Sequence, residues 1–89
     1  MIEVRVRPFG AFRDYSAEAP IAVQLPQGSG LPELRAALIG RLSELRPDLD
    51  AAGLVRDSAF ADEAQVILGA ADRIDRPCTL FALPPVCGG

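Results

Sequence analysis

Apolar and polar residues alternate along two stretches near the start of the chain. In residues 2–8 every second residue is aliphatic, with charged residues between them, until Pro8. Residues 21–25 alternate in the same way between Pro20 and Pro26. A period of two places alternate side chains on opposite faces of an extended strand. The pattern therefore predicts two half-buried strands, which we expect to pair as a hairpin.

A stripe of leucines with helical spacing follows a break at residues 27–30. The leucines recur at steps of three and four residues, with Glu and Arg off the stripe. This spacing predicts an amphipathic helix of about four turns. Ser29 or Gly30 is suited to cap the helix, and Pro32 falls in its first turn. Pro47 ends it. We expect the whole stripe to lie in the core: Leu31, Leu34, Leu38, Leu42 and Leu45.

The second half of the chain carries weaker signals before a final apolar run. We interpret residues 48–53 as a connection with a possible helical turn, and residues 54–68 as one or two short strands. Residues 78–83 form a compact apolar run with Pro on both sides, which is typical of a central strand buried on both faces. The helix supplies the crossover that would place this last strand parallel to the first. The predicted fold is an α+β roll, a mixed sheet of four to five strands with one main helix packed across it.

Length and composition fit one small globular domain. The chain has 89 residues, of which 49% are hydrophobic and 24% charged. A chain of this size buries roughly 60% of its unfolded surface, which is enough for one core. We expect a domain over residues 1–86 and a flexible tail at residues 87–89.

The side-chain inventory argues against catalysis by this chain alone. It contains no His, no Trp and no Lys, and all nine basic residues are Arg. The usual general bases are His and a Lys of depressed pKa, and a Ser or Cys nucleophile needs such a partner. Two cysteines without His do not make the usual zinc site, so we expect no metal. Cys78 and Cys87 are expected to be reduced, with Cys78 a buried, inert thiol.

The formal net charge of −3 disfavours nucleic acid and anionic lipid as partners. The first residues alternate charged and apolar side chains, which is unlike a signal peptide. No apolar stretch reaches the length of a membrane helix. These features predict a cytoplasmic protein.

The last seven residues, LPPVCGG at positions 83–89, are the most unusual stretch. Two consecutive prolines stop a strand and send the chain on in an extended form. The four residues after the second proline, Pro85, reach up to about 14 Å. Two glycines make the tip a thread without side chains, able to enter a narrow slot.

This ending resembles that of the small subunit of molybdopterin synthase, also called molybdopterin-converting factor subunit 1, a ubiquitin-like sulfur carrier. In that family Pro-Pro-Val, a small residue and Gly-Gly end the chain. An opening strand that leads to Phe-Gly-x-Phe-Arg, here residues 9–13, the leucine-striped helix and the length agree with it. The resemblance is specific only in the last seven residues. It implies the β-grasp fold, in agreement with the architecture that the alternation predicts.

The resemblance implies a sulfur carrier that is not an enzyme by itself. An E1-like adenylyltransferase would adenylylate the C-terminal glycine with ATP and Mg²⁺, while the carrier itself binds no cofactor. A sulfur donor such as a cysteine desulfurase or a rhodanese would then give a thiocarboxylate. A free carboxylate, with a pKa near 3.5, needs a leaving group before sulfur can displace it. The tail would enter the large subunit of molybdopterin synthase and pass its sulfur to precursor Z.

The resemblance also assigns site residues. It places the reactive carboxyl on Gly89, next to Gly88, although paired glycines also occur at frayed chain ends. Phe9 and Phe12 suit either a docking surface or the core. The set expected to contact partners is Phe9, Phe81, Leu83, Pro84, Pro85 and Val86.

Cys87 stands where the family usually has Ala, Ser or Thr. It is either a tolerated small residue or an accessory thiol that captures the acyl group or carries a persulfide.

Other functions stay open at this point. A related carrier would serve another acceptor, in thiamine thiazole, cysteine or siderophore synthesis or in tRNA thiolation. The Pro-Pro-Val segment favours molybdopterin. A ubiquitin-like modifier or an interaction module is the alternative of a different class. Without Lys, the chain offers only its α-amino group as an acceptor, so it suits a donor better than a link in a branched chain.

Overall fold

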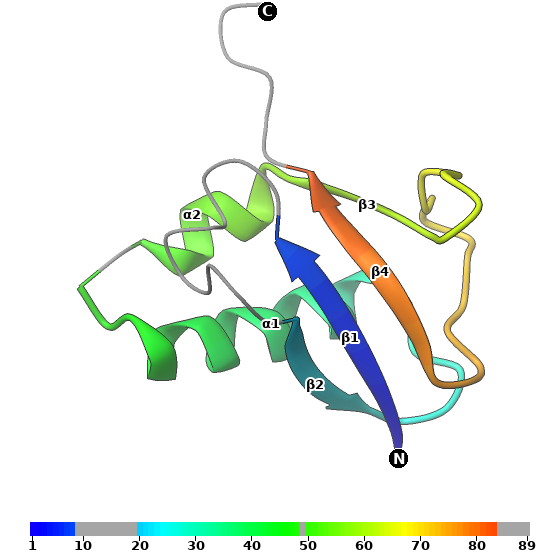
Figure 1. Cartoon of the computed structure of the whole chain (residues 1–89), viewed down its shortest axis with the longest axis horizontal. Helices are drawn as coiled ribbons and strands as arrows, with labels where there is room; N and C mark the ends of the chain where they lie inside the picture. The colour runs from blue at the N-terminus through cyan, green and yellow to red at the C-terminus, as the bar shows by residue number, and fades with distance from the viewer. Residues whose placement is uncertain (9–19, 49, 84–89) are drawn as a thin grey trace, which may run out of the picture.

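The structure is a computed structural model that describes residues 1–8, 20–48 and 50–83. These described residues form four strands and two helices (Figure 1). In chain order they are β1 Ile2–Pro8, β2 Ile21–Leu25, α1 Leu31–Leu45, α2 Ala51–Arg56, β3 Ala59–Ala61 and β4 Cys78–Leu83.

The strands form one mixed sheet in the order β2-β1-β4-β3. β1 and β2 are antiparallel, with Val4 opposite Val23. β4 lies parallel to β1, with Leu80 opposite Val6, and β3 completes the sheet antiparallel to β4. The predicted hairpin, the parallel last strand and its central position are therefore confirmed.

Helix α1 packs across one face of this sheet and closes the core (Figure 1). Gly30 is its N-cap, and the Glu33 carboxylate accepts a hydrogen bond from the Gly30 amide at 3.1 Å. The first and second strands each turn one set of alternate side chains into the core, as predicted. The buried residues of these elements are Val4, Val6, Ile21, Val23, Leu25, Leu34, Leu38 and Leu42.

The leucine stripe is core except at its ends. Leu34, Leu38 and Leu42 are fully buried, and Leu31 is half-buried. The prediction is wrong for Leu45, which is 40% exposed. Leu45 is the last residue of α1, and Figure 1 shows this end of the helix running on beyond β2, where the sheet no longer covers it.

The segment between α1 and β4 is more helical than predicted. α2 occupies Ala51–Arg56 and so extends into the stretch expected to form strands, of which only β3 is present, with three residues. The Asp50 carboxylate caps α2 by accepting a hydrogen bond from the Gly53 amide at 3.0 Å. Such short elements carry too few residues to show a period in the sequence.

Only one face of β4 is buried, which corrects the prediction of burial on both. Leu80 and Ala82 lie in the core, while Cys78, Thr79, Phe81 and Leu83 are half-buried. Among the described residues, helices cover only the inner face of the sheet. Neither α1 nor α2, the helices that the described residues form, is long and apolar enough to cross a membrane.

Candidate functional site

The candidate site is the end of the sheet at which β4 finishes. Leu83, the last described residue, pairs with Ala59 of β3. The chain therefore leaves this sheet from a central strand that has a neighbour on each side. Seven of the predicted site residues lie outside the described residues: Phe9, Pro84, Pro85, Val86, Cys87, Gly88 and Gly89.

The two described members of the predicted contact set lie together. Phe81 and Leu83 are two residues apart on β4, so their side chains project from the same, outer face of the sheet. They line a hollow of about 290 Å³ together with Ala61 and Ile67. We call these four residues, Ala61, Ile67, Phe81 and Leu83, the outer patch. Ile67 is 53% exposed, and the adjacent Val66 is 57% exposed.

A tight turn after β3 brings Ile67 to the outer patch. The Asp62 carboxylate accepts hydrogen bonds from the amides of Ala64, at 2.9 Å, and Val66, at 3.0 Å. Gln65 has a φ of 66°, in the left-handed region, which a non-glycine residue adopts only under such constraint. The Leu68 amide then donates to the Phe60 carbonyl at 2.8 Å. The sequence did not predict Ile67 as a site residue, because residues 54–68 were interpreted as one or two short strands.

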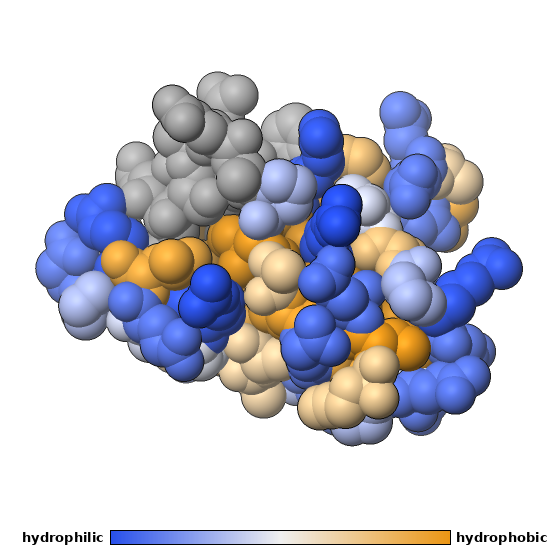
Figure 2. All heavy atoms as spheres, turned by 60° about the horizontal axis from the view of Figure 1, so that its bottom comes forward, coloured by the Kyte–Doolittle hydropathy of each residue, from blue (hydrophilic) through white to orange (hydrophobic). Residues whose placement is uncertain are grey.

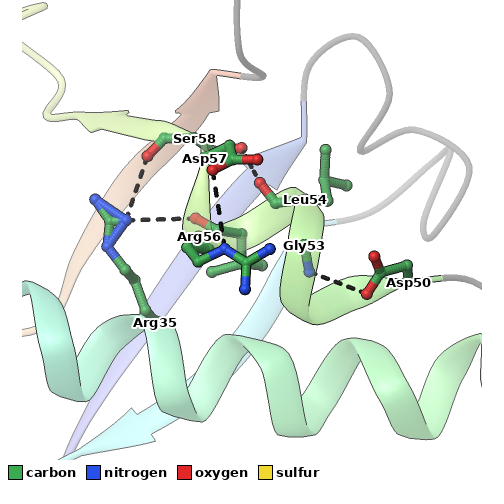
Figure 3. A network of polar contacts seen from close by, with 8 residues as sticks. Arg35, Asp50, Gly53, Leu54, Arg56, Asp57 and Ser58 are labelled. Carbon is green, nitrogen blue, oxygen red and sulfur yellow. Dashed lines mark hydrogen bonds and ion pairs between the residues drawn. The ribbon is translucent and has the colours of Figure 1, made fainter.

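Arg35 of α1 supports the outer patch from the inner side of the molecule (Figure 3). Its Nη1 donates to the carbonyls of Val55 and Ser58, each at 3.3 Å. Its guanidinium carbon lies 5.5 Å from the centroid of the Phe60 ring, a cation–π distance. The Ser58 hydroxyl donates back to the Leu54 carbonyl, which closes the end of α2. These bonds fix the start of β3, which pairs with β4 beneath the outer patch.

Cys78 lies at the far end of β4 from Leu83, and it is half-buried, less than predicted. Burial raises the pKa of the Cys78 thiol above its usual 9.0, and the negative charge of Glu63 raises it further. The thiol is therefore protonated at neutral pH and is a poor nucleophile.

No group of three His, Cys, Asp or Glu residues within the described ranges is placed to hold a metal ion.

Solved structures share this architecture over nearly the whole chain. A Pyrococcus furiosus protein described as molybdopterin converting factor, subunit 1, superposes with a TM-score of 0.68 at 18% identity, covering 97% of this chain and 100% of its own. SAMP1 from Haloferax volcanii gives 0.66 at 17% identity, covering 98% and 99%. The chain has the β-grasp, ubiquitin-like fold. A further solved structure, that of the Haloferax volcanii HVO 2177 protein, gives a TM-score of 0.67 at 21% identity, covering 99% of this chain and 87% of its own.

The comparisons by sequence add nothing to this β-grasp assignment. No protein-family model matches the chain, and no curated protein matches it. Identities near one residue in five establish a common fold and leave function to be argued from the site.

Proposed function

We propose that this protein is a sulfur carrier whose C-terminal Gly89 is converted to a thiocarboxylate for molybdopterin synthesis. The observation that carries the proposal is that β4, a central strand after which residues 84–89 follow in the sequence, ends beside the apolar outer patch. The β-grasp neighbour described as molybdopterin converting factor, subunit 1, supports the same reading. So does the Pro-Pro-Val-Cys-Gly-Gly ending.

The chemistry requires three steps, and this chain supplies the carboxyl group throughout. In the first, the Gly89 carboxylate attacks the α-phosphorus of ATP and displaces pyrophosphate, giving an acyl-adenylate. In the second, a persulfide sulfur from a donor protein attacks the acyl carbon and AMP leaves. Reductive cleavage of the resulting acyl disulfide by a thiol releases the thiocarboxylate. An E1-like enzyme would supply the ATP and Mg²⁺ site, because this chain has no His and no Lys to act as a base.

The outer patch would dock the carrier on its partners. Phe81 and Leu83 present apolar surface next to the exit of the chain, and the exposed Arg7 lies opposite Phe81 in the register. Apolar side chains in a hollow are the usual anchors of an interface. Pro84, Pro85 and Val86 would then guide the tail into the slot of the synthase large subunit. Phe9 is proposed as part of the same surface.

Intact-mass spectrometry tests the proposal directly. The full chain is incubated with an E1-like adenylyltransferase, ATP, Mg²⁺ and a persulfide-bearing rhodanese. We expect a mass increase equal to the replacement of one oxygen by sulfur, and none in a variant that lacks Gly89. Recovery of only the free carboxylate from the unaltered chain would refute the carrier function. Omission of ATP provides the matched control.

A ubiquitin-like modifier is the second candidate, because the same fold is that of SAMP1. In that case the activated Gly89 would be joined to lysines of other proteins. Mass spectrometry of proteins from the native host separates the two functions. Peptides that carry this chain's terminal residues on a lysine indicate a modifier, whereas co-purification with a synthase large subunit identifies molybdopterin as the product. Carriers for thiamine thiazole, cysteine, siderophores or tRNA would co-purify with other acceptors.

A further inference from the structure

Arg7 lies beside the outer patch, on the neighbouring strand β1. It is paired with Phe81 of β4, which is paired on its other side with Ala61 of β3. Paired residues project from the same face of a sheet, and neighbouring strands are about 5 Å apart. Arg7, Phe81 and Ala61 therefore form one row across the outer face, with the exposed Arg7 at one end.

The described residues do not compensate the positive charge of Arg7. Arg5, two residues earlier on β1, is paired with the Glu3 carboxylate at 3.1 Å. No described residue forms an ion pair with Arg7. Asp62, the acidic residue that lines the hollow of the outer patch, accepts hydrogen bonds from two amides of its own turn instead. Arg7 is thus an uncompensated cation next to apolar surface.

A folded protein that docks on the outer patch would also cover Arg7. A standard interface takes about 800 Å² from each partner, which corresponds to a circle of about 16 Å radius. Arg7 is one strand spacing from Phe81, well within such a circle. Covering an unpaired cation weakens a complex, whereas a carboxylate placed against the guanidinium can accept two hydrogen bonds from it. The charge therefore favours a partner with an acidic group at this point.

The activating enzyme is the partner to which this requirement applies first. A sulfur carrier and a ubiquitin-like modifier both need the Gly89 carboxyl group to be adenylylated before any further step. The same class of enzyme would therefore dock on the chain in either case.

We infer that Arg7 determines which activating enzyme accepts this chain, by pairing with a carboxylate on the docking surface of that enzyme. The outer patch supplies the apolar contact, and Arg7 disfavours enzymes with a neutral or basic group opposite it. The inference rests on the proposed function and adds to it a residue that sets specificity without touching the reacting atoms.

ATP–pyrophosphate exchange with the E1-like adenylyltransferase of the native host tests the role of Arg7. The full chain is the varied substrate, so the assay gives its KM and kcat. Breaking a buried charge pair costs at least about 2 kcal/mol, or about 30-fold in affinity. We expect Arg7→Glu to raise KM by at least about this factor with kcat nearly unchanged. Arg7→Lys keeps the charge and should restore most of the affinity.

Ionic strength separates a charge pair from a merely structural role of Arg7. Raising it from about 0.1 M to about 1 M shortens the screening length from about 10 Å to about 3 Å. The KM of the unaltered chain should rise more than that of Arg7→Gln, which has no charge to screen. Amide spectra of the free variants check that the fold is retained.

A second charge reversal controls for the overall charge of the chain. Figure 2 shows hydrophilic residues standing between apolar ones over the end of the molecule that is lowest in Figure 1, so other charges are exposed as well. Arg41→Glu changes the net charge by the same amount on α1, which packs on the opposite face of the sheet. Its KM should stay within about twofold of that of the unaltered chain, since rim charges remote from a contact contribute little.

Two outcomes would overturn this inference alone. The first is an unchanged KM for Arg7→Glu, and the second is an equal rise in KM for Arg7→Glu and Arg41→Glu. If the unaltered chain is not adenylylated at all, the proposed function fails and the inference fails with it. If adenylylation occurs without formation of a thiocarboxylate, only the sulfur chemistry is refuted, and the KM values still decide the role of Arg7.

Discussion

The two edges of the sheet are built in different ways. The β3 edge has only three residues of strand, and its position depends on polar groups brought from elsewhere, namely Arg35 and the Asp62 carboxylate. The β2 edge has five residues of strand in strict alternation and no described backbone partner on its second side. The edge next to the candidate site therefore depends on side-chain bonds, while the distant edge depends on its pairing with β1 and on the burial of alternate residues.

The way in which β3 is held matters for the proposed docking of the carrier on its partners. A short strand held by pairing alone frays readily, because few hydrogen bonds oppose its conformational entropy. The bonds of Arg35 to the carbonyls of Val55 and Ser58 hold β3 from the inner side, and the turn at Asp62 holds it from the edge. The outer patch is thus a rigid surface that includes Leu83, the last described residue of β4.

Truncating the central side chain of the β3 edge should have the largest effect. Phe60 is 1% exposed and contacts the Arg35 guanidinium. We expect Phe60→Ala to cost about 3–5 kcal/mol of unfolding free energy through the cavity that it leaves. Urea unfolding followed by circular dichroism measures this. Leu25→Ala at the β2 edge is the matched comparison, and an equal or larger loss there would contradict the greater dependence of the β3 edge on single side chains.

Removing the Arg35 guanidinium should have the next largest effect. Arg35→Met keeps much of the side-chain bulk but removes the guanidinium bonds to the carbonyls of Ser58 and Val55, which we expect to cost about 1–3 kcal/mol, although the Val55 carbonyl still accepts from the Ser58 amide at 3.2 Å. Arg41→Met on the same helix removes only the exposed pair with Glu44 and should cost less than about 1 kcal/mol. Thermal unfolding of both variants measures the two losses of unfolding free energy. Equal losses would show that Arg35 does not support the β3 edge.

The Asp62 turn can be weakened separately. Asp62→Ala removes the acceptor for the amides of Ala64 and Val66, and we expect a loss of about 1 kcal/mol. Faster hydrogen exchange at the Val66 amide should accompany it. Asp62→Asn retains a carbonyl oxygen and should restore most of the protection. Unchanged exchange in Asp62→Ala would mean that backbone bonds alone hold the turn.

Two alanine substitutions near the β2 edge should have smaller effects of opposite sign. Gly40→Ala lies within α1 with open space around it, so we expect a gain of about 0.5–1 kcal/mol. Gly28→Ala falls in the turn after β2, where φ is +86°, and should be destabilising. Differential scanning calorimetry detects both shifts. A stabilising Gly28→Ala would indicate that this turn readily changes its conformation.

The parts of the fold that the sequence predicts are those where burial repeats over several residues. The alternation at residues 2–8 and 21–25 predicted β1 and β2, and the leucine spacing predicted α1. The apolar run at residues 78–83 predicted β4. The parallel pairing of the first and last strands was inferred from the crossover that the predicted helix supplies. The β-grasp fold was therefore predictable without any knowledge of the loops.

The parts that were not predicted depend on contacts between distant residues. α2 and β3 are held by Arg35, which is 20 residues from Val55 and 23 from Ser58 along the chain. Of the outer patch, Phe81 and Leu83 were predicted, whereas Ile67 reaches it only because the chain turns at Asp62. No local sequence pattern predicts these side-chain contacts.

The parallel pairing of β1 and β4 also has a mechanical consequence. If a partner pulls on the tail, the force runs along β4, which is bonded to β1 on one side and to β3 on the other. The bonds to both neighbours are then loaded together in shear, instead of being opened one after another. If the proposed sulfur transfer draws the end of this chain into other enzymes, this arrangement would resist unfolding by them.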